Sequence, residues 1–240
     1  MRLTENQPKW GAETAIAAAL TITATVFIVH SIFGFGIIRF TSWHIELHSN
    51  FTRNMIVVPI IEVLILAETM LFARHKHAGL NDLGLVRTTP KTLARVLPAL
   101  MALYLSTVVV TFVLTNVFGP DSMAEAFTVE AMPKGPSQLV AYLIIYMVLV
   151  GPAEELAFRG FVQKGLENTF GELKGLLIAS VLFGLPHIIN YPYNAATAAA
   201  TGLVLGYVWQ KTGQNTTATA VLHGTFNSIG VILVYLSNFV

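Results

Sequence analysis

The sequence contains no cysteine and few charged residues. Only 11% of its 240 residues are charged, whereas 54% are hydrophobic; a soluble domain usually carries about 25% charged residues. The lack of cysteine excludes disulfides, thiolate metal sites and a cysteine nucleophile. The formal net charge of +1 gives no general basic character, so we expect no nucleic-acid partner. This composition indicates an integral membrane protein rather than a soluble one.

The apolar residues form long blocks, which predict an all-α, polytopic membrane protein of about seven transmembrane helices. A span needs about 20 apolar residues. The first block is too long for the apolar region of a signal peptide, so we expect a retained helix. The fifth and sixth blocks are short and are joined by a tight turn, so they predict a helical hairpin that need not cross the whole bilayer. The blocks are roughly 14–38, 54–73, 93–117, 138–161, 175–190, 194–210 and 216–237.

Lysine and arginine are distributed unevenly between the predicted loops. Only Arg39, Arg53 and Lys134 fall on the side opposite the N-terminus. Because positive residues favour cytoplasmic loops, we predict a cytoplasmic N-terminus and an outer C-terminus, in the plasma membrane if the cell is prokaryotic. The eleven residues on the N-terminal side are Arg2, Lys9, Arg74, Lys76, Arg87, Lys91, Arg95, Arg159, Lys164, Lys174 and Lys211.

Two adjacent carboxylates, Glu154 and Glu155, interrupt the fourth apolar block. An ionisable group inside a span costs about 2.5–3.5 kcal/mol on insertion scales, so such groups persist where they are paired, hydrated or functional. Glu155 and Arg159 are four residues apart and can pair on one helix face, and we favour a structural role for that pair. Glu154 points to a different face and has no local counter-ion. It is therefore our candidate general base.

Polar side chains also occur in the fifth and seventh blocks. His187 lies near the end of the fifth, and His223 and Asn227 share one face of the last helix through their i,i+4 spacing. Each alone is more often a packing or helix-joining group than a catalytic one. With a rise of about 1.5 Å per residue, these side chains and Glu154 all fall within about 10 Å of midplane. Three helices can thus assemble a base, two imidazoles and an amide, which are the parts of a hydrolytic site.

A zinc site is another use of the same residues. Glu154, His187 and His223 can ligate Zn2+ and leave a position for water, although no acidic neighbour of either histidine in the sequence offers the hydrogen bond that usually orients a ligand. We favour zinc over a metal-free site and expect no organic cofactor. Glu62, in the second block, either lines the same cavity or bonds to a neighbouring helix, and we favour the bond.

The motifs Glu154-Glu155-x-x-x-Arg159, Phe183-x-x-x-His187 and His223-x-x-x-Asn227 resemble the three motifs of the CPBP (Abi) family in order, spacing and helix placement. This family groups CAAX prenyl endopeptidases with bacteriocin-processing and immunity proteins. The resemblance covers about residues 138–236. It suggests N-terminal membrane helices with a cytoplasmic loop at 1–137 and a catalytic membrane core at 138–240. Residues 81–85 are similar to a weak upstream feature of the family, and they predict an interfacial amphipathic stretch or a capped turn.

The resemblance implies an intramembrane endopeptidase that cleaves a peptide or lipidated protein tail near the cytoplasmic face. It implies Glu154 as the water activator with His187 beside it. It implies His223 and Asn227 as oxyanion donors, or His223 as a metal ligand. Since the family includes immunity and scaffolding members, a non-catalytic membrane partner is the alternative. A proton-coupled transporter is a weaker alternative, because the chain has no evident repeat or paired broken helices.

Overall fold

The structure is a computed structural model that describes residues 8–34, 50–119, 133–189 and 192–237. All of its regular elements within these ranges are helical, which confirms the all-α prediction. The α-helices are α1 (Ala12–Gly34), α2 (Asn50–His75), α3 (Pro90–Val96), α4 (Ala99–Phe118), α6 (Pro136–Ile145), α7 (Gly151–Glu155), α8 (Lys164–Phe170), α9 (Glu172–Gly184), α10 (Pro192–Lys211) and α11 (Thr216–Ser237). Two π-helical segments, η3 (Tyr146–Val150) and η4 (Leu156–Gln163), and a 3-10 segment, η5 (Leu185–Ile189), complete the set.

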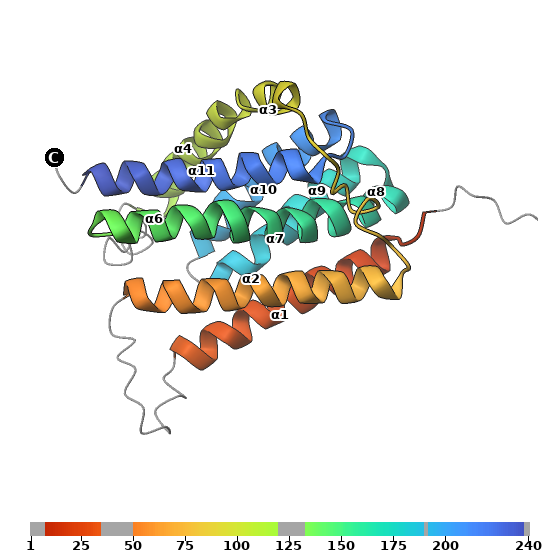
Figure 1. The fold of residues 1–240 in the computed structure, drawn as a ribbon, viewed down its shortest axis with the longest axis horizontal. Helices are drawn as coiled ribbons and strands as arrows, with labels where there is room; N and C mark the ends of the chain where they lie inside the picture. Colours follow the sequence, from red (N-terminus) through yellow and green to blue (C-terminus); the bar gives the residue numbers. More distant parts are fainter. Residues whose placement is uncertain (1–7, 35–49, 120–132, 190–191, 238–240) are drawn as a thin grey trace, which may run out of the picture.

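The helices pack side by side as a bundle, consistent with a multi-pass membrane protein. Figure 1 shows α6, η3, α7, η4 and α8 as one continuous rod, with α11 on one side of it and α2 on the other. In the described residues, six helical segments are long and apolar enough to cross a membrane. The predicted sixth span instead forms α10, a less apolar helix of 20 residues that packs against α9 and α4. The bundle thus holds the seven predicted helices, six of which meet the requirement for a span.

Two predicted spans contain a break that proline explains. The third is divided at Leu97 and Pro98 into the short α3 and the long α4. The fifth leaves α-helical geometry after Gly184 and ends in η5, which contains Pro186. Proline has no N–H to donate and disfavours the preceding helical turn. The hairpin turn predicted at 190–194 lies partly outside the described residues.

Most basic residues of the predicted loops lie at one end of the bundle. Figure 1 shows the start of α1, the end of α2, the α8–α9 junction and the α10–α11 link together at that end. Arg159 was counted with these loops, but it is fully buried in η4. Arg2 and Arg39 lie outside the described residues. The basic residues at the shared end include Lys9, Arg74, Lys76, Lys164, Lys174 and Lys211.

The segment 81–85 is a turn that holds the start of α11 against the central rod. Thr216 donates its hydroxyl to the carbonyl oxygen of Leu83 at 2.7 Å, and its N–H donates to the carbonyl of Gly84 at 2.9 Å. Gly84 has a φ of 73°, which favours glycine. Lys164 of α8 donates to the carbonyl of Asp82 at 2.6 Å. The capped-turn alternative therefore describes this segment, and the turn fixes α11 relative to α8.

The N-terminal helices share one hydrophobic core with η4 and α9. Trp10, just before α1, stacks on Phe161 with ring centroids 4.8 Å apart, and its indole N–H donates to the Phe161 carbonyl at 2.9 Å. Since η4 follows directly on the two glutamates, this core sets the position of the polar residues in the rod.

Candidate active site

The two glutamates lie on α7, a single short turn between two π-helical segments. Pro152 stands at the start of α7 and has no N–H to donate to the preceding turn. π-helical turns in α-helices are uncommon and occur frequently at functional sites. The side chain of Glu155 is fully buried, whereas that of Glu154 retains 13% exposure. The adjacent carboxylates therefore face different surroundings, as their angular separation predicts.

Glu155 and Arg159 form a buried ion pair. Arg159 Nε lies 3.2 Å from Glu155 Oε2, and both side chains are completely shielded from solvent. The guanidinium also lies over the ring of Phe183, 4.5 Å from its centroid, which is a cation–π contact. Its Nη groups have no hydrogen-bond partner among the described residues. The predicted pairing of Glu155 with Arg159 agrees with this arrangement.

His223 of α11 lies between the two glutamates. Its Nδ1 is 3.1 Å from Glu155 Oε1, and its Nε2 is 3.7 Å from Glu154 Oε2. An ionised carboxylate can only accept, so Nδ1 donates to Glu155, and this bond fixes the ring with Nε2 towards Glu154. No acidic residue adjoins this histidine in the sequence; Glu155, 68 residues away, is brought beside it by packing.

His187 and Asn227 lie near this centre but are not bonded to Glu154. The ring of Phe183 connects the two histidines, with centroids 5.2 Å from His187 and 6.0 Å from His223. His187 Nδ1 pairs with the carbonyl oxygen of Phe183 at 3.0 Å. Asn227 is half-buried, one turn beyond His223 on α11. In the described part of the chain, neither residue hydrogen-bonds Glu154, whereas His223 approaches it to 3.7 Å.

Two glycines allow α11 to approach the rod closely. A Cβ on Gly151 would lie 2.6 Å from the carbonyl oxygen of Ala220 and 3.0 Å from the nitrogen of Gly224. A Cβ on Gly224 would lie 2.9 Å from the carbonyl oxygen of Tyr146. Small residues permit such backbone contact between membrane helices. Their positions beside the candidate site residues were a signal for this contact, since Gly151 lies three residues before Glu154 and Gly224 directly follows His223.

Glu62 of α2 is a further acidic residue at this centre. It is buried, with 4% exposure, and its carboxylate is close enough to that of Glu154 to interact electrostatically. Its Oε2 has no hydrogen-bond partner among the described residues. The helix α2 packs directly against α7. Glu62 therefore adjoins the candidate site, which is the alternative that the sequence analysis favoured less.

The predicted zinc ligands do not converge. Within the described ranges, no group of three His, Cys, Asp or Glu side chains is close enough to hold a metal ion. Glu154 and His223 approach each other, whereas His187 Nδ1 pairs with the Phe183 carbonyl oxygen. These side chains, as placed, do not form the predicted set of three ligands, so we derive no chemical step through a metal.

The fold and the site together define a class: an all-helical, multi-pass membrane protein with a buried carboxylate–histidine centre. Residues 136–229 match the family model described as type II CAAX prenyl endopeptidase Rce1-like. This match confirms the resemblance to the CPBP family, and the segment includes all of the predicted site residues from Glu154 to Asn227. No curated protein and no solved structure matches the chain.

Proposed function

We propose that the protein is an intramembrane endopeptidase in which Glu154 activates water. The observation that carries the proposal is the contact between Glu154 and His223, made inside a segment that matches an endopeptidase family. Of the two adjacent carboxylates, Glu154 is the one that is not fully buried and has no arginine partner. These properties suit a group that must take a proton from water.

In the proposed reaction, Glu154 removes a proton from water, and the resulting hydroxide attacks the carbonyl carbon of the scissile peptide bond. The carbon–nitrogen bond then breaks, and the proton passes to the leaving amine. The Nδ1–H of His223 donates to Glu155 and keeps the ring oriented, so Nε2, which faces Glu154, can accept the proton that Glu154 takes from water. Asn227 supplies an amide that can donate to the oxyanion, because it shares a face of α11 with His223.

We further propose that the substrate is a peptide or a lipidated protein tail presented near the basic end of the bundle. The family description names CAAX prenyl endopeptidases, which supports a tail substrate. The bundle's basic end carries Lys9, Lys164 and Lys174, and this side is predicted to be cytoplasmic.

The test is the isosteric substitution Glu154→Gln, with Glu172→Gln as the control. Glu172 is an exposed acidic residue at the start of α9. We expect Glu154→Gln to lower cleavage by at least the roughly 10²–10⁴-fold that a general base contributes, with unchanged thermal unfolding. Substrates are found by comparing the peptide termini in membranes from wild-type and Glu154→Gln cells. Cleavage is then measured with purified protein.

Retained cleavage in Glu154→Gln would remove Glu154 from the mechanism. If the peptide termini do not differ between the wild-type and Glu154→Gln cells, and the variant keeps the cellular phenotype of the wild type, the protein acts as a non-catalytic membrane partner. The Glu172→Gln control should match the wild type in every measurement, which separates loss of a particular carboxylate from loss of one negative charge.

A further inference from the structure

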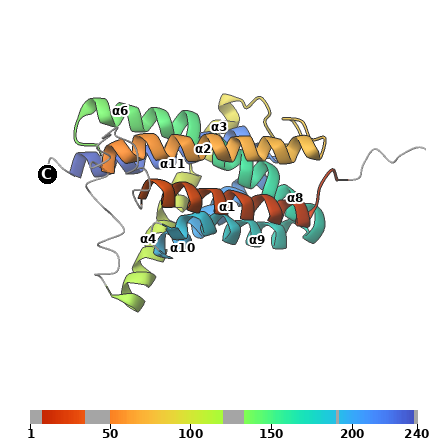
Figure 2. The same cartoon turned by 90° about the horizontal axis from the view of Figure 1, so that it is seen from below.

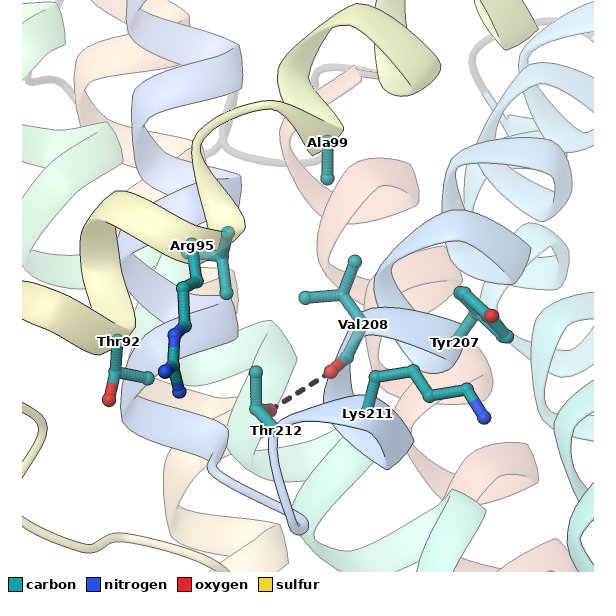
Figure 3. Close-up of a pocket in the computed structure, with 8 residues that line it drawn as sticks. Thr92, Arg95, Ala99, Tyr207, Val208, Lys211 and Thr212 are labelled. Atoms are coloured by element: carbon teal, nitrogen blue, oxygen red, sulfur yellow. Dashed lines mark hydrogen bonds between the residues drawn. The ribbon is translucent and has the colours of Figure 1, made fainter.

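A pocket of about 390 Å³ lies between α3 and α10, at the basic end of the bundle and apart from the glutamate centre. Figure 3 shows Arg95 reaching from α3 along the gap towards Thr212, while Lys211 extends from the end of α10 on the other side. Both cationic side chains are exposed. Arg95 therefore points along the pocket, whereas the ammonium of Lys211 turns away from Arg95 towards Tyr207 at the rim.

The positive charge of this pocket is not neutralised by the protein. No acidic residue lines it. In the described part of the chain, neither Arg95 nor Lys211 forms a salt bridge. The ammonium of Lys211 lies 5.2 Å from the centroid of the Tyr207 ring, and Thr212 donates its hydroxyl to the carbonyl of Val208 at 2.9 Å. The guanidinium of Arg95 thus keeps its donors available for an anion, and its planar fork suits phosphate oxygens.

Half of the residues that line the pocket are apolar, and an exposed apolar surface adjoins them on α10. Val96, Ala99 and Val208 line it, and Tyr207 is 53% exposed at its edge. Towards the middle of the bundle, the exposed apolar surface continues along α10, where Leu203, one turn before Tyr207, is 40% exposed. Figure 2 shows α4 beside α10 at the margin of the bundle. A ligand with an anionic head group and an apolar chain matches a cationic pocket that adjoins an exposed apolar surface.

We propose that the pocket binds an anionic phospholipid, with the phosphate at Arg95, an acyl chain along Tyr207 and Leu203 of α10, and Lys211 adding positive charge at the rim. The bond-forming group is the guanidinium of Arg95, which binds phosphate oxygens as a charged planar fork; the ammonium of Lys211 contributes attraction from the rim. Basic pockets between membrane helices on the cytoplasmic side are known to bind anionic headgroups. The same charges can hold free phosphate, but the adjoining apolar surface favours the lipid.

The experiment uses the purified full chain in a neutral detergent, titrated with phosphatidylglycerol or phosphatidylcholine, with bound lipid counted by native mass spectrometry. Arg95→Gln and Lys211→Gln should each weaken phosphatidylglycerol binding about fivefold, since one basic residue near a membrane surface contributes on the order of 1 kcal/mol. Lys91→Gln is the matched control, because Lys91 is exposed on the same short helix but does not line the pocket. It should bind as the wild type does. Phosphatidylcholine binding should change in none of the variants.

Arg95→Lys keeps the charge and should retain most of the binding, so it preserves the test if a glutamine variant unfolds. Equal phosphatidylglycerol binding by wild type, Arg95→Gln and Lys211→Gln would overturn the proposal. An equal loss in Lys91→Gln would also overturn it, because it would mean attraction by general surface charge. Inorganic phosphate at millimolar concentration should fail to displace the lipid; displacement would assign the pocket to free phosphate instead.

Discussion

Replacing Gly224 by alanine should push α11 away from the rod that carries both glutamates. The new Cβ would lie 2.9 Å from the Tyr146 carbonyl oxygen, 3.0 Å from the Met147 Sδ and 3.1 Å from the Met147 Cα. Two of these are backbone atoms, so the strain is relieved by moving a helix rather than by rotating a side chain. Ordinary contact begins near 3.4 Å, so the helices must separate by about 0.5 Å, because packed interiors leave no slack.

Two opposing effects determine the change in the free energy of unfolding. Inserting a methyl group into a packed contact typically costs about 1–3 kcal/mol. Alanine is favoured over glycine inside a helix by roughly 0.8–1.0 kcal/mol. We therefore expect Gly224→Ala to destabilise the protein by about 0–2 kcal/mol. Gly230→Ala, on the same helix, isolates the helix preference, since among the described residues the atom nearest its Cβ is the Tyr104 hydroxyl at 4.0 Å.

The effect on activity should exceed the effect on stability. The bond from His223 to Glu155 is 3.1 Å long, so a separation of about 0.5 Å takes it past ordinary hydrogen-bond length. A displacement of 1 Å in a catalytic centre can cost on the order of 10²-fold in rate. We expect Gly224→Ala to lose more than about tenfold in cleavage and Gly230→Ala to stay near the wild type.

Cleavage of a substrate peptide and thermal unfolding by tryptophan fluorescence measure these two quantities. Equal activity and stability in Gly224→Ala and Gly230→Ala would refute the close approach of α11 to the rod. Equal loss in both would show instead that any alanine on α11 is harmful.

Three further predictions concern the buried pair, the orientation and the metal. Arg159→Ala should destabilise the fold by about 3–5 kcal/mol, because it leaves the buried Glu155 carboxylate without its counter-ion. Adding Glu155→Gln should restore part of that stability. Unchanged unfolding with reduced turnover would instead assign Arg159 to substrate contact. Reporter fusions at Lys91 and Lys134 should report opposite sides of the membrane, with Lys91 cytoplasmic, and two equal signals would overturn the order of spans. The zinc prediction requires that elemental analysis finds about one zinc per active chain and that His223→Ala loses this zinc. Full activity after exhaustive chelation would contradict the prediction.

The sequence was sufficient for the fold class because the signals for it are local. A block of apolar residues predicts a helix wherever it lies, and proline explains the two breaks, at Pro98 and Pro186, as a local effect. The pair of Glu155 and Arg159 was predictable for the same reason, since both residues lie on one helix. The π-helical segments around α7 were not predicted, because no residue pattern distinguishes them from the α-helix that surrounds them.

The partners of His223 could not be predicted, because they depend on how helices pack. Glu155 is 68 residues away in sequence from His223, and the two meet because Gly151 and Gly224 let their helices approach. The position of Glu62 depends in the same way on the contact between α2 and α7. The predicted depth in the membrane placed these residues at one level of the bundle. It did not predict which of the side chains at that level contact one another.

The adjacent glutamates should differ in what their loss does, even though each substitution removes one carboxylate. Glu155 holds Arg159 and His223 at once and is fully buried, so Glu155→Gln leaves a guanidinium without its counter-ion and should impair folding. Glu154 is partly exposed and touches only the histidine among these groups, so Glu154→Gln strands no buried charge and should impair only the reaction. Two variants one residue apart therefore separate support of the site from its chemistry, and the arrangement around α7 predicts which is which.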